Sequence, residues 1–114
     1  MTSIDLQPPV NKPLYDRLNL TPTELQQLCQ QWQIQEFALF GSILRSDFRP
    51  DSDIDILLTF QPQATWTLFD IVHLQQDLEH RTGRKIDLAE KPQLRNPYRR
   101  AEILKTHRIL YVSA

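Results

Sequence analysis

The sequence is short of several residue types, and each shortage excludes a class of protein. Its single cysteine, Cys29, cannot form an internal disulfide, which fits a reducing compartment. No apolar run approaches the ~20 residues that a membrane-spanning helix needs. The first thirteen residues have neither a basic start nor an apolar stretch, so no secretory signal is visible. We therefore expect a cytoplasmic protein without membrane contact.

The remaining composition is that of an ordinary globular protein. The chain has 114 residues, 40% of them hydrophobic and 24% charged, which predicts one domain with a modest core. Three of the eight prolines fall within residues 1–13, which show no periodic pattern. We therefore assign residues 1–19 to an N-terminal arm and residues 20–114 to a folded domain.

The net charge of −1 is unevenly spread along the chain. Residues 1–83 hold five Lys/Arg and eleven Asp/Glu, a balance of −6, whereas residues 84–114 hold eight and three, a balance of +5. The basic segment is either a solvated helix face or a cationic wall for a polyphosphate or an acidic partner. Charge alone does not choose between them.

Hydrophobic periodicity predicts a mixed α+β order of elements. Thr21-Pro22-Thr23-Glu24 has the pattern of a capping box ahead of a helix, and Gly83 is placed to cap another helix at its C-terminal end. Apolar positions at helical or alternating spacing define the other elements. The expected helices cover 22–32, 66–82 and 98–106, with one or two turns at 42–47, and the expected strands cover 37–40, 52–60, 85–89 and 108–112.

Asp53 and Asp55 interrupt the strand at 52–60, where a buried strand favours apolar side chains. Because strand side chains alternate, the two carboxylates project from one face about 6–7 Å apart. Two like charges this close repel, and a hard divalent cation such as Mg²⁺ resolves the conflict. The alternative is a strand with one face open to water and two ordinary surface aspartates, and a bare Asp-x-Asp does not distinguish the two.

Three other features accompany this pair. Asp87 lies in another apolar strand and can bring a third carboxylate alongside. Gly41-Ser42 ends one strand and opens a helical turn, where backbone N–H groups and a hydroxyl can hold phosphate oxygens. Arg45, one turn later, can aim a guanidinium at the same anion, or can pair with a nearby aspartate instead. Together these residues predict a site for a metal-bound nucleoside triphosphate.

Other motifs do not fit the chain. Asp51, Asp53 and Asp55 match the first ligands of an EF-hand loop, but Ile56 replaces its turn glycine and Pro62 its bidentate glutamate. The chain has no GxxxxGK[ST], GxGxxG or GxSxG sequence, and its three histidines lack the spacing of a zinc site.

With these residues, the chain resembles the minimal nucleotidyltransferase (MNT) domains of the DNA polymerase β-type nucleotidyltransferase superfamily. The family pattern is Gly-Ser, about ten residues, Asp-x-Asp and a later Asp, matched here by Gly41-Ser42, Asp53-Ile54-Asp55 and Asp87. Common relatives have glycine where Ser46 stands, a change that alters the turn but removes no ligand. The resemblance covers about residues 20–112 and implies a short mixed β-sheet flanked by helices.

The resemblance also implies a chemistry, the transfer of AMP from ATP to a hydroxyl with two Mg²⁺ ions. By analogy, Asp53 and Asp55 would hold the metals. Asp87 would hold the catalytic metal and help deprotonate the acceptor. Gly41 and Ser42 would cradle the triphosphate, with Arg45 as a further nucleotide ligand.

Stand-alone domains of this kind resemble the antitoxin halves of MNT–HEPN pairs, in which the transferase adds AMP to a tyrosine of a helical HEPN ribonuclease toxin. The resemblance therefore implies a HEPN partner. Two other functions stay open: an antitoxin that neutralises its toxin by binding alone, through an apolar surface around Trp66, Phe69 or the C-terminal helix, and a transferase for a small molecule or a nucleic acid. The short chain and the absence of basic stretches interleaved with aromatics disfavour direct nucleic-acid binding.

Overall fold

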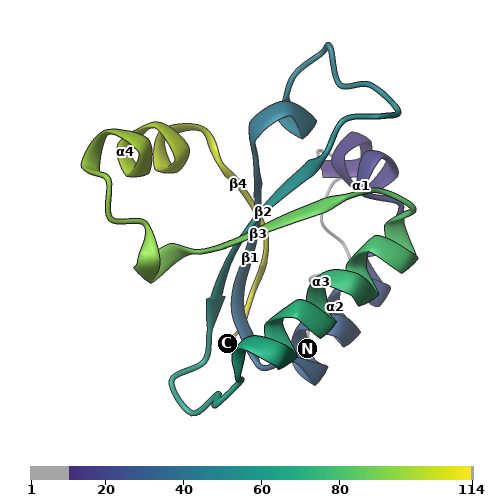
Figure 1. The fold of residues 1–114 in the computed structure, drawn as a ribbon. Coiled ribbons are helices and arrows are strands. Elements are labelled where there is room, and N and C mark those ends of the chain that lie inside the picture. Colours follow the sequence, from purple (N-terminus) through teal and green to yellow (C-terminus); the bar gives the residue numbers. More distant parts are fainter. Residues whose placement is uncertain (1–10, 114) are drawn as a thin grey trace.

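The computed structural model describes residues 11–113 and shows a four-stranded sheet with helices on both faces (Figure 1). The α+β fold expected from the sequence is confirmed. The elements are α1 (Lys12–Leu18), α2 (Pro22–Gln31), β1 (Ile34–Phe40), the 3₁₀ turn η3 (Gly41–Leu44), β2 (Ile54–Phe60), α3 (Leu68–Thr82), β3 (Ile86–Glu90), the 3₁₀ turn η4 (Lys91–Gln93), α4 (Pro97–Thr106) and β4 (Arg108–Val112). Within the described range, none of the helices is both long and apolar enough to cross a bilayer.

The sheet is mixed, and its strand order is β3-β2-β1-β4. Strand β1 runs antiparallel to both β2 and β4, whereas β2 and β3 are parallel. A parallel pair needs a crossover connection, and α3 supplies it. The antiparallel β1–β2 pair is joined by η3 and a longer loop, so the turn after β1 lies beside the first residues of β2.

The two faces of the sheet bury different amounts of apolar surface. Helices α1, α2 and α3 cover one face (Figure 1) and enclose the larger core, to which β2 contributes Ile54, Ile56 and Leu58. The opposite face carries a smaller cluster, in which Leu57 of β2 joins Ile103 of α4. The alternation predicted for β2 is confirmed, and it leaves the odd-numbered positions of this strand on the α4 face.

Helix ends follow the capping chemistry of the sequence. The predicted capping box at α2 is present, since the Thr21 hydroxyl accepts from the Glu24 N–H and the Glu24 carboxylate accepts from the Thr21 N–H. A second box, formed by Thr67 and Asp70, starts α3 and was not anticipated. Gly83 ends α3 in the left-handed conformation, as predicted, with φ 73°.

Part of the predicted N-terminal arm is helical and packed. Residues 12–18 form α1, with Leu14 and Leu18 buried in the larger core, and the Tyr15 hydroxyl donates to the Leu110 carbonyl at 3.3 Å. Residues 1–10 lie outside the described range. The packed core therefore begins before residue 20, because the apolar spacing of two leucines outweighs the proline content of the segment.

Replacing Leu18 tests whether α1 belongs to the folded core. The Leu18 side chain is completely buried, so Leu18→Ala should lower the free energy of unfolding by about 2–4 kcal/mol, as cavity-creating substitutions do. Leu68→Ala is the control, since that leucine is 78% exposed and should change stability by about 0.5 kcal/mol or less. Urea denaturation measures both, and equal midpoints would contradict the packed assignment of α1.

Candidate active site

The sheet register brings the predicted carboxylates to one place. Asp55 of β2 is the partner of Asp87 in the parallel β2–β3 ladder and of Phe40 in the antiparallel β1–β2 ladder. Partnered residues in adjacent strands project from the same face, so both carboxylates lie on the α4 face. Asp53 precedes β2 by one residue and continues the same alternation. The three aspartates therefore meet where β1 ends and β2 and β3 begin.

The charges of Asp53 and Asp87 act on the Asp55 carboxyl. Burial raises the pKa of the half-buried Asp55 carboxyl, and the negative charges of Asp87 and then Asp53 raise it further. The positive charge of Arg99 lowers the Asp55 pKa and so offsets part of this effect. The register of the β2–β3 ladder places Asp87 on the same face as Asp55, where the sequence predicts a third carboxylate.

The donor set suits a hard cation, although it does not form a closed cage. Among residues 11–113, no three acidic, histidine or cysteine side chains stand in an arrangement already set to hold a metal ion. Asp53 and Asp87 are exposed and Asp55 is half-buried, so the cluster is open on one side. Mg²⁺ is commonly held by one or two carboxylates together with water and substrate phosphates, and that mode fits an open carboxylate cluster.

Gly41 packs directly against the carboxylate cluster. Its φ is +76°, a left-handed conformation that side chains disfavour, and a Cβ atom there would overlap the Asp55 Oδ2 atom. The next residue, Ser42, donates from its hydroxyl to the Asp53 carbonyl at 3.3 Å. The Gly-Ser turn is therefore pressed against the aspartate pair, which requires glycine at position 41.

The loop between Ser42 and Asp53 is held by two arginines that sequence reasoning did not find. Arg17 of α1 donates to the Ile43 and Arg45 carbonyls at 2.7 and 2.6 Å. Arg84 donates to the carbonyls of Arg49, Pro50 and Ser52 at 2.8–3.3 Å. Their guanidinium groups also lie over the Phe48 ring, at 5.4 and 4.3 Å from its centroid.

The arginine predicted to bind phosphate already has an acidic neighbour. Arg45 pairs with Asp47 at 3.2 Å, and both side chains are exposed. The sequence left this pairing open as an alternative to anion binding. Arg99 of α4, which the sequence analysis did not name, is instead the cation that acts on Asp55. Its signal in the sequence was the basic balance of residues 84–114.

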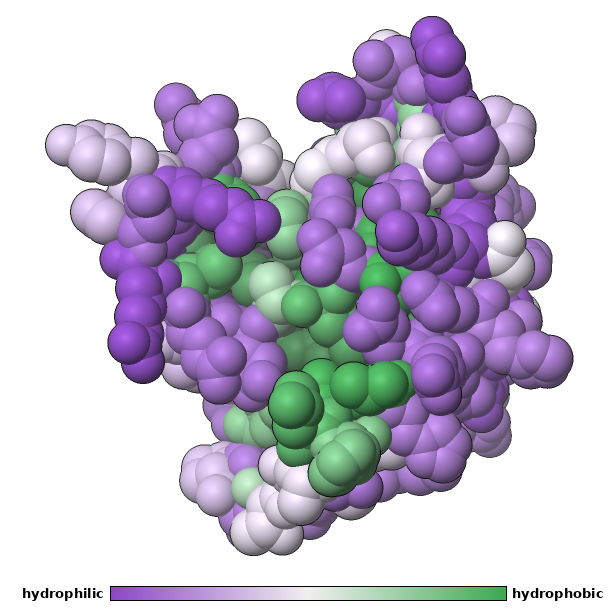
Figure 2. Space-filling model, in the orientation of Figure 1, coloured by the Kyte–Doolittle hydropathy of each residue, from purple (hydrophilic) through white to green (hydrophobic). Residues whose placement is uncertain are grey.

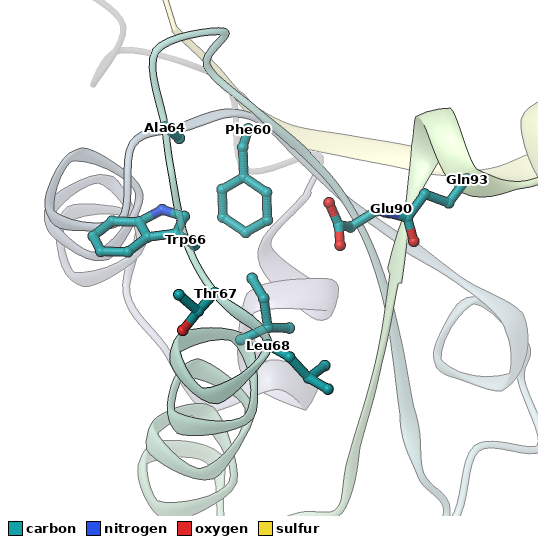
Figure 3. A pocket seen from close by; sticks show the side chains of 8 residues that line it. Phe60, Ala64, Trp66, Thr67, Leu68, Glu90 and Gln93 are labelled. Carbon is teal, nitrogen blue, oxygen red and sulfur yellow. The ribbon is translucent and has the colours of Figure 1, made fainter.

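A separate groove lies away from the carboxylates. It has a volume of about 360 Å³ and lies between the start of α3 and the end of β3 (Figure 3). Next to it, Leu68 and Phe69 are 78% and 87% exposed, and Val72 is also exposed. Figure 2 shows apolar surface gathered over this end of α3. The groove is lined by Phe60, Ala64, Trp66, Thr67, Leu68, Ile71, Glu90 and Gln93.

The mixed sheet places the Gly41-Ser42 turn next to the aspartates of β2 and β3. This arrangement is typical of domains that transfer nucleotides. Comparison with known families agrees with this class: the model of the nucleotidyltransferase domain matches residues 24–110. The chain belongs to the nucleotidyltransferase domain family, as its resemblance to MNT domains predicted.

One similar protein and two solved structures of similar fold illustrate the relationship. The protein adenylyltransferase MntA of Thermococcus cleftensis is 31% identical over 70 residues, which are 61% of this chain and 69% of that protein. A chain of a crystal structure of a toxin–antitoxin with AMP-PNP matches 82% of this chain and 75% of its own length, with a TM-score of 0.66 at 20% identity. The complex of a tri-AMPylated Shewanella oneidensis HEPN toxin with its MNT antitoxin matches 81% and 70%, with a TM-score of 0.58 at 19% identity. These two structures show that the fold is shared.

Replacing Gly41 and Gly83 by alanine separates the cost of left-handed backbone strain from the cost of steric overlap with Asp55. Gly41→Ala should destabilise the protein by more than about 2 kcal/mol, because left-handed strain adds to the overlap with Asp55. Gly83→Ala is the matched control: its φ is +73°, but nothing lies within 4 Å of the added carbon, so only strain of about 1 kcal/mol is expected. Denaturant midpoints compare the two, and equal losses would show that Asp55 does not crowd Gly41.

Neutralising Asp55 should stabilise the protein in the absence of divalent cations. A carboxyl whose pKa is raised by folding is destabilising once it is ionised. At pH 7, Asp55→Asn should therefore raise the free energy of unfolding by about 1 kcal/mol or less, since Asp55 is only half-buried, and the variant should unfold at a higher temperature. The difference from wild type should grow as pH rises from the ordinary aspartate pKa to the raised pKa of Asp55, and then stay constant. Thermal denaturation in EDTA from pH 3 to 8 measures it; a less stable variant at pH 7 contradicts the repulsion.

Proposed function

We propose that this nucleotidyltransferase moves AMP from ATP to a hydroxyl of a partner protein, with Asp53, Asp55 and Asp87 as its catalytic residues. The observation that carries the proposal is the partnering of Asp55 with Asp87 beside the Gly41-Ser42 turn. A relative named as a protein adenylyltransferase, and a shared fold with a chain of an AMPylated toxin–antitoxin complex, support the choice of AMP and of a protein acceptor.

The transfer step follows from the groups at the site. The acceptor oxygen forms a bond to the α-phosphorus of ATP, the bond from that phosphorus to the bridging oxygen breaks, and its electron pair leaves with pyrophosphate. The acceptor proton passes to the Asp87 carboxylate. Asp53, Asp55 and Asp87 would hold two Mg²⁺ ions, which supply positive charge to the attacking and leaving oxygens. Backbone N–H groups at Gly41 and Ser42 hold triphosphate oxygens, where the absence of a side chain at position 41 leaves room.

The acceptor in this proposal is a tyrosine of a HEPN toxin, which makes the chain its antitoxin. The surface around the groove supports a protein partner, because exposed Leu68, Phe69 and Val72 form an apolar patch that a second protein can cover. The Glu90 carboxylate faces Phe60 across this groove (Figure 3) and makes neither a hydrogen bond nor an ion pair with any described residue. We assign the patch to a helix of the toxin that carries apolar side chains and one basic residue for Glu90.

The second candidate is an antitoxin that acts by binding alone. The same apolar patch favours it, because contact at Leu68 and Phe69 does not require the carboxylates. The two functions differ in what they predict for aspartate variants, so one experiment distinguishes them.

The test is labelling of a co-purified partner. The chain is purified with the product of the adjacent gene and incubated with ATP labelled on the α-phosphate and Mg²⁺. We expect label on the partner, its loss in EDTA, and a drop of at least about 100-fold in Asp53→Asn and Asp55→Asn, since each removes a carboxylate charge from the site. Asp16→Asn, an exposed aspartate paired with Lys12 on α1, is the matched control and should label normally.

Two outcomes would overturn the transferase function. One is a partner that stays unlabelled with the wild-type chain, and the other is full labelling by both aspartate variants. If toxin activity is neutralised equally by wild type and by the unlabelled variants, the binding-only function is the correct one.

A further inference from the structure

The positive charge of Arg99 acts on the Asp55 carboxyl, and Arg99 has no assigned task. We propose that Arg99 binds the β- and γ-phosphates of the nucleotide and then the departing pyrophosphate. This inference rests on the proposed nucleotide transfer and deepens it, because it adds a substrate-binding residue that lies outside the Gly-Ser and Asp-x-Asp pattern.

Helix α4 has a defined start and is joined to the rest of the domain by a hydrogen bond and one buried side chain. The Asn96 side chain accepts from the N–H groups of Tyr98 and Arg99 at 3.0 and 3.1 Å, which starts the helix at a defined residue. Ile103 is buried in the small cluster on the α4 face. The Arg100 guanidinium donates to the Lys91 carbonyl at 2.8 Å and ties the helix to η4. Arg99 therefore lies in the first turn of a helix with a defined start.

The packing of Ile103 indicates where Arg99 lies relative to the sheet. Residues four apart are neighbours on a helix surface, so Arg99 lies one turn before Ile103, at the exposed edge of the side that packs against the sheet. The cluster around Ile103 contains Phe40 and Leu57. Phe40 is the strand partner of Asp55, and Leu57 is the next residue of β2 on the same face. Arg99 thus lies at the edge of the cluster that Asp55 also borders, in agreement with the effect of its charge on Asp55.

The Arg99 guanidinium is available for a ligand. Its side chain is exposed and forms no hydrogen bond or ion pair with the residues that the structure describes. Two other arginines differ in this respect, because Arg45 pairs with Asp47 and Arg100 donates to the Lys91 carbonyl. Arg99 is near enough to the carboxylates to act on Asp55 and yet makes no direct pair with them.

The charged groups of Arg99 and of the three aspartates favour a polyphosphate as the ligand. On one side are carboxylates that suit cations, and on the other is a planar cation whose fork of N–H groups matches phosphate oxygens. An anion that bears metal ions satisfies both sides, whereas a neutral ligand satisfies neither. The tail of a nucleoside triphosphate is such an anion, and its negative charge increases on the leaving pyrophosphate as the α-phosphorus bond breaks.

A structural explanation for Arg99 makes a different prediction. If Arg99 only offsets repulsion among the aspartates, removing it should lower stability and weaken every nucleotide equally. If it binds the β- and γ-phosphates, removing it should weaken a triphosphate but not a monophosphate. A comparison of ligands with and without these phosphates therefore separates the two roles.

The test measures binding of AMP-PNP and of AMP in Mg²⁺ by calorimetry. Arg99→Ala should weaken AMP-PNP by about 10- to 100-fold, the range for one lost charge-assisted contact, and change AMP by about twofold or less. Arg99→Lys should recover part of the loss, because it keeps the charge without the fork. Lys105→Ala is the matched control: it removes one exposed cation from a different side of α4 and should bind both ligands normally. Circular dichroism verifies that each variant is folded.

Several results would overturn the assignment. They are unchanged AMP-PNP affinity in Arg99→Ala, equal weakening of AMP-PNP and AMP, or an equal loss in Lys105→Ala. Failure of the proposed function is distinguishable, because a chain that binds AMP-PNP but labels no partner still reports on Arg99. A wild-type chain that binds no AMP-PNP would refute both.

Discussion

The crowding of Asp53 and Asp87 against the half-buried Asp55 at one end of the sheet is the constraint on which the site depends. Strand partnering places Asp55 beside Asp87, and the alternation of β2 places Asp53 on the same side, so the fold itself imposes the crowding. The cost is tolerable because the same strand buries Ile54, Ile56 and Leu58 on the opposite face. One strand therefore contributes to the main core with its even-numbered residues and builds the charged site with its odd-numbered ones.

The same constraint explains how the loop ahead of β2 is built. Its position relative to Asp55 is set by Gly41 at one end and Asp53 at the other, and between them Ile43 is buried in the larger core while Leu44 and Phe48 pack against it. Arg17 and Arg84 hold this loop through backbone carbonyls, and the guanidinium groups of both lie over the Phe48 ring. Since Arg17 belongs to α1, the helix that starts the described chain also supports the turn beside the carboxylates. Stability of α1 and geometry of the site are thus physically connected.

Local patterns in the sequence revealed much of the fold and the centre of the site. The Thr21–Glu24 box, the alternation of β2 and the convergence of Asp55 with Asp87 each follow from periodicity or from a short motif, and each was predicted. Helix α1 was missed because two buried leucines give a weak signal next to clustered prolines. The arginine contacts were missed because they join residues 26–35 positions apart, and no local pattern encodes such a pair. The roles of the site residues in catalysis remain predictions.

The basic C-terminal segment shows why net charge was a poor guide to function. Its cations perform unrelated tasks: Arg84 braces the loop, Lys91 pairs with Glu36 at 2.9 Å, and Arg100 fastens α4. A uniform cationic wall would leave all of them open to an anion, whereas these three are engaged within the protein. Arg99 differs because α4 presents it to the carboxylates without a direct partner. The charge imbalance of the sequence therefore acts on the site through individual side chains. The position of each basic side chain in the fold, rather than the net charge of the segment, decides whether it is available to a polyphosphate.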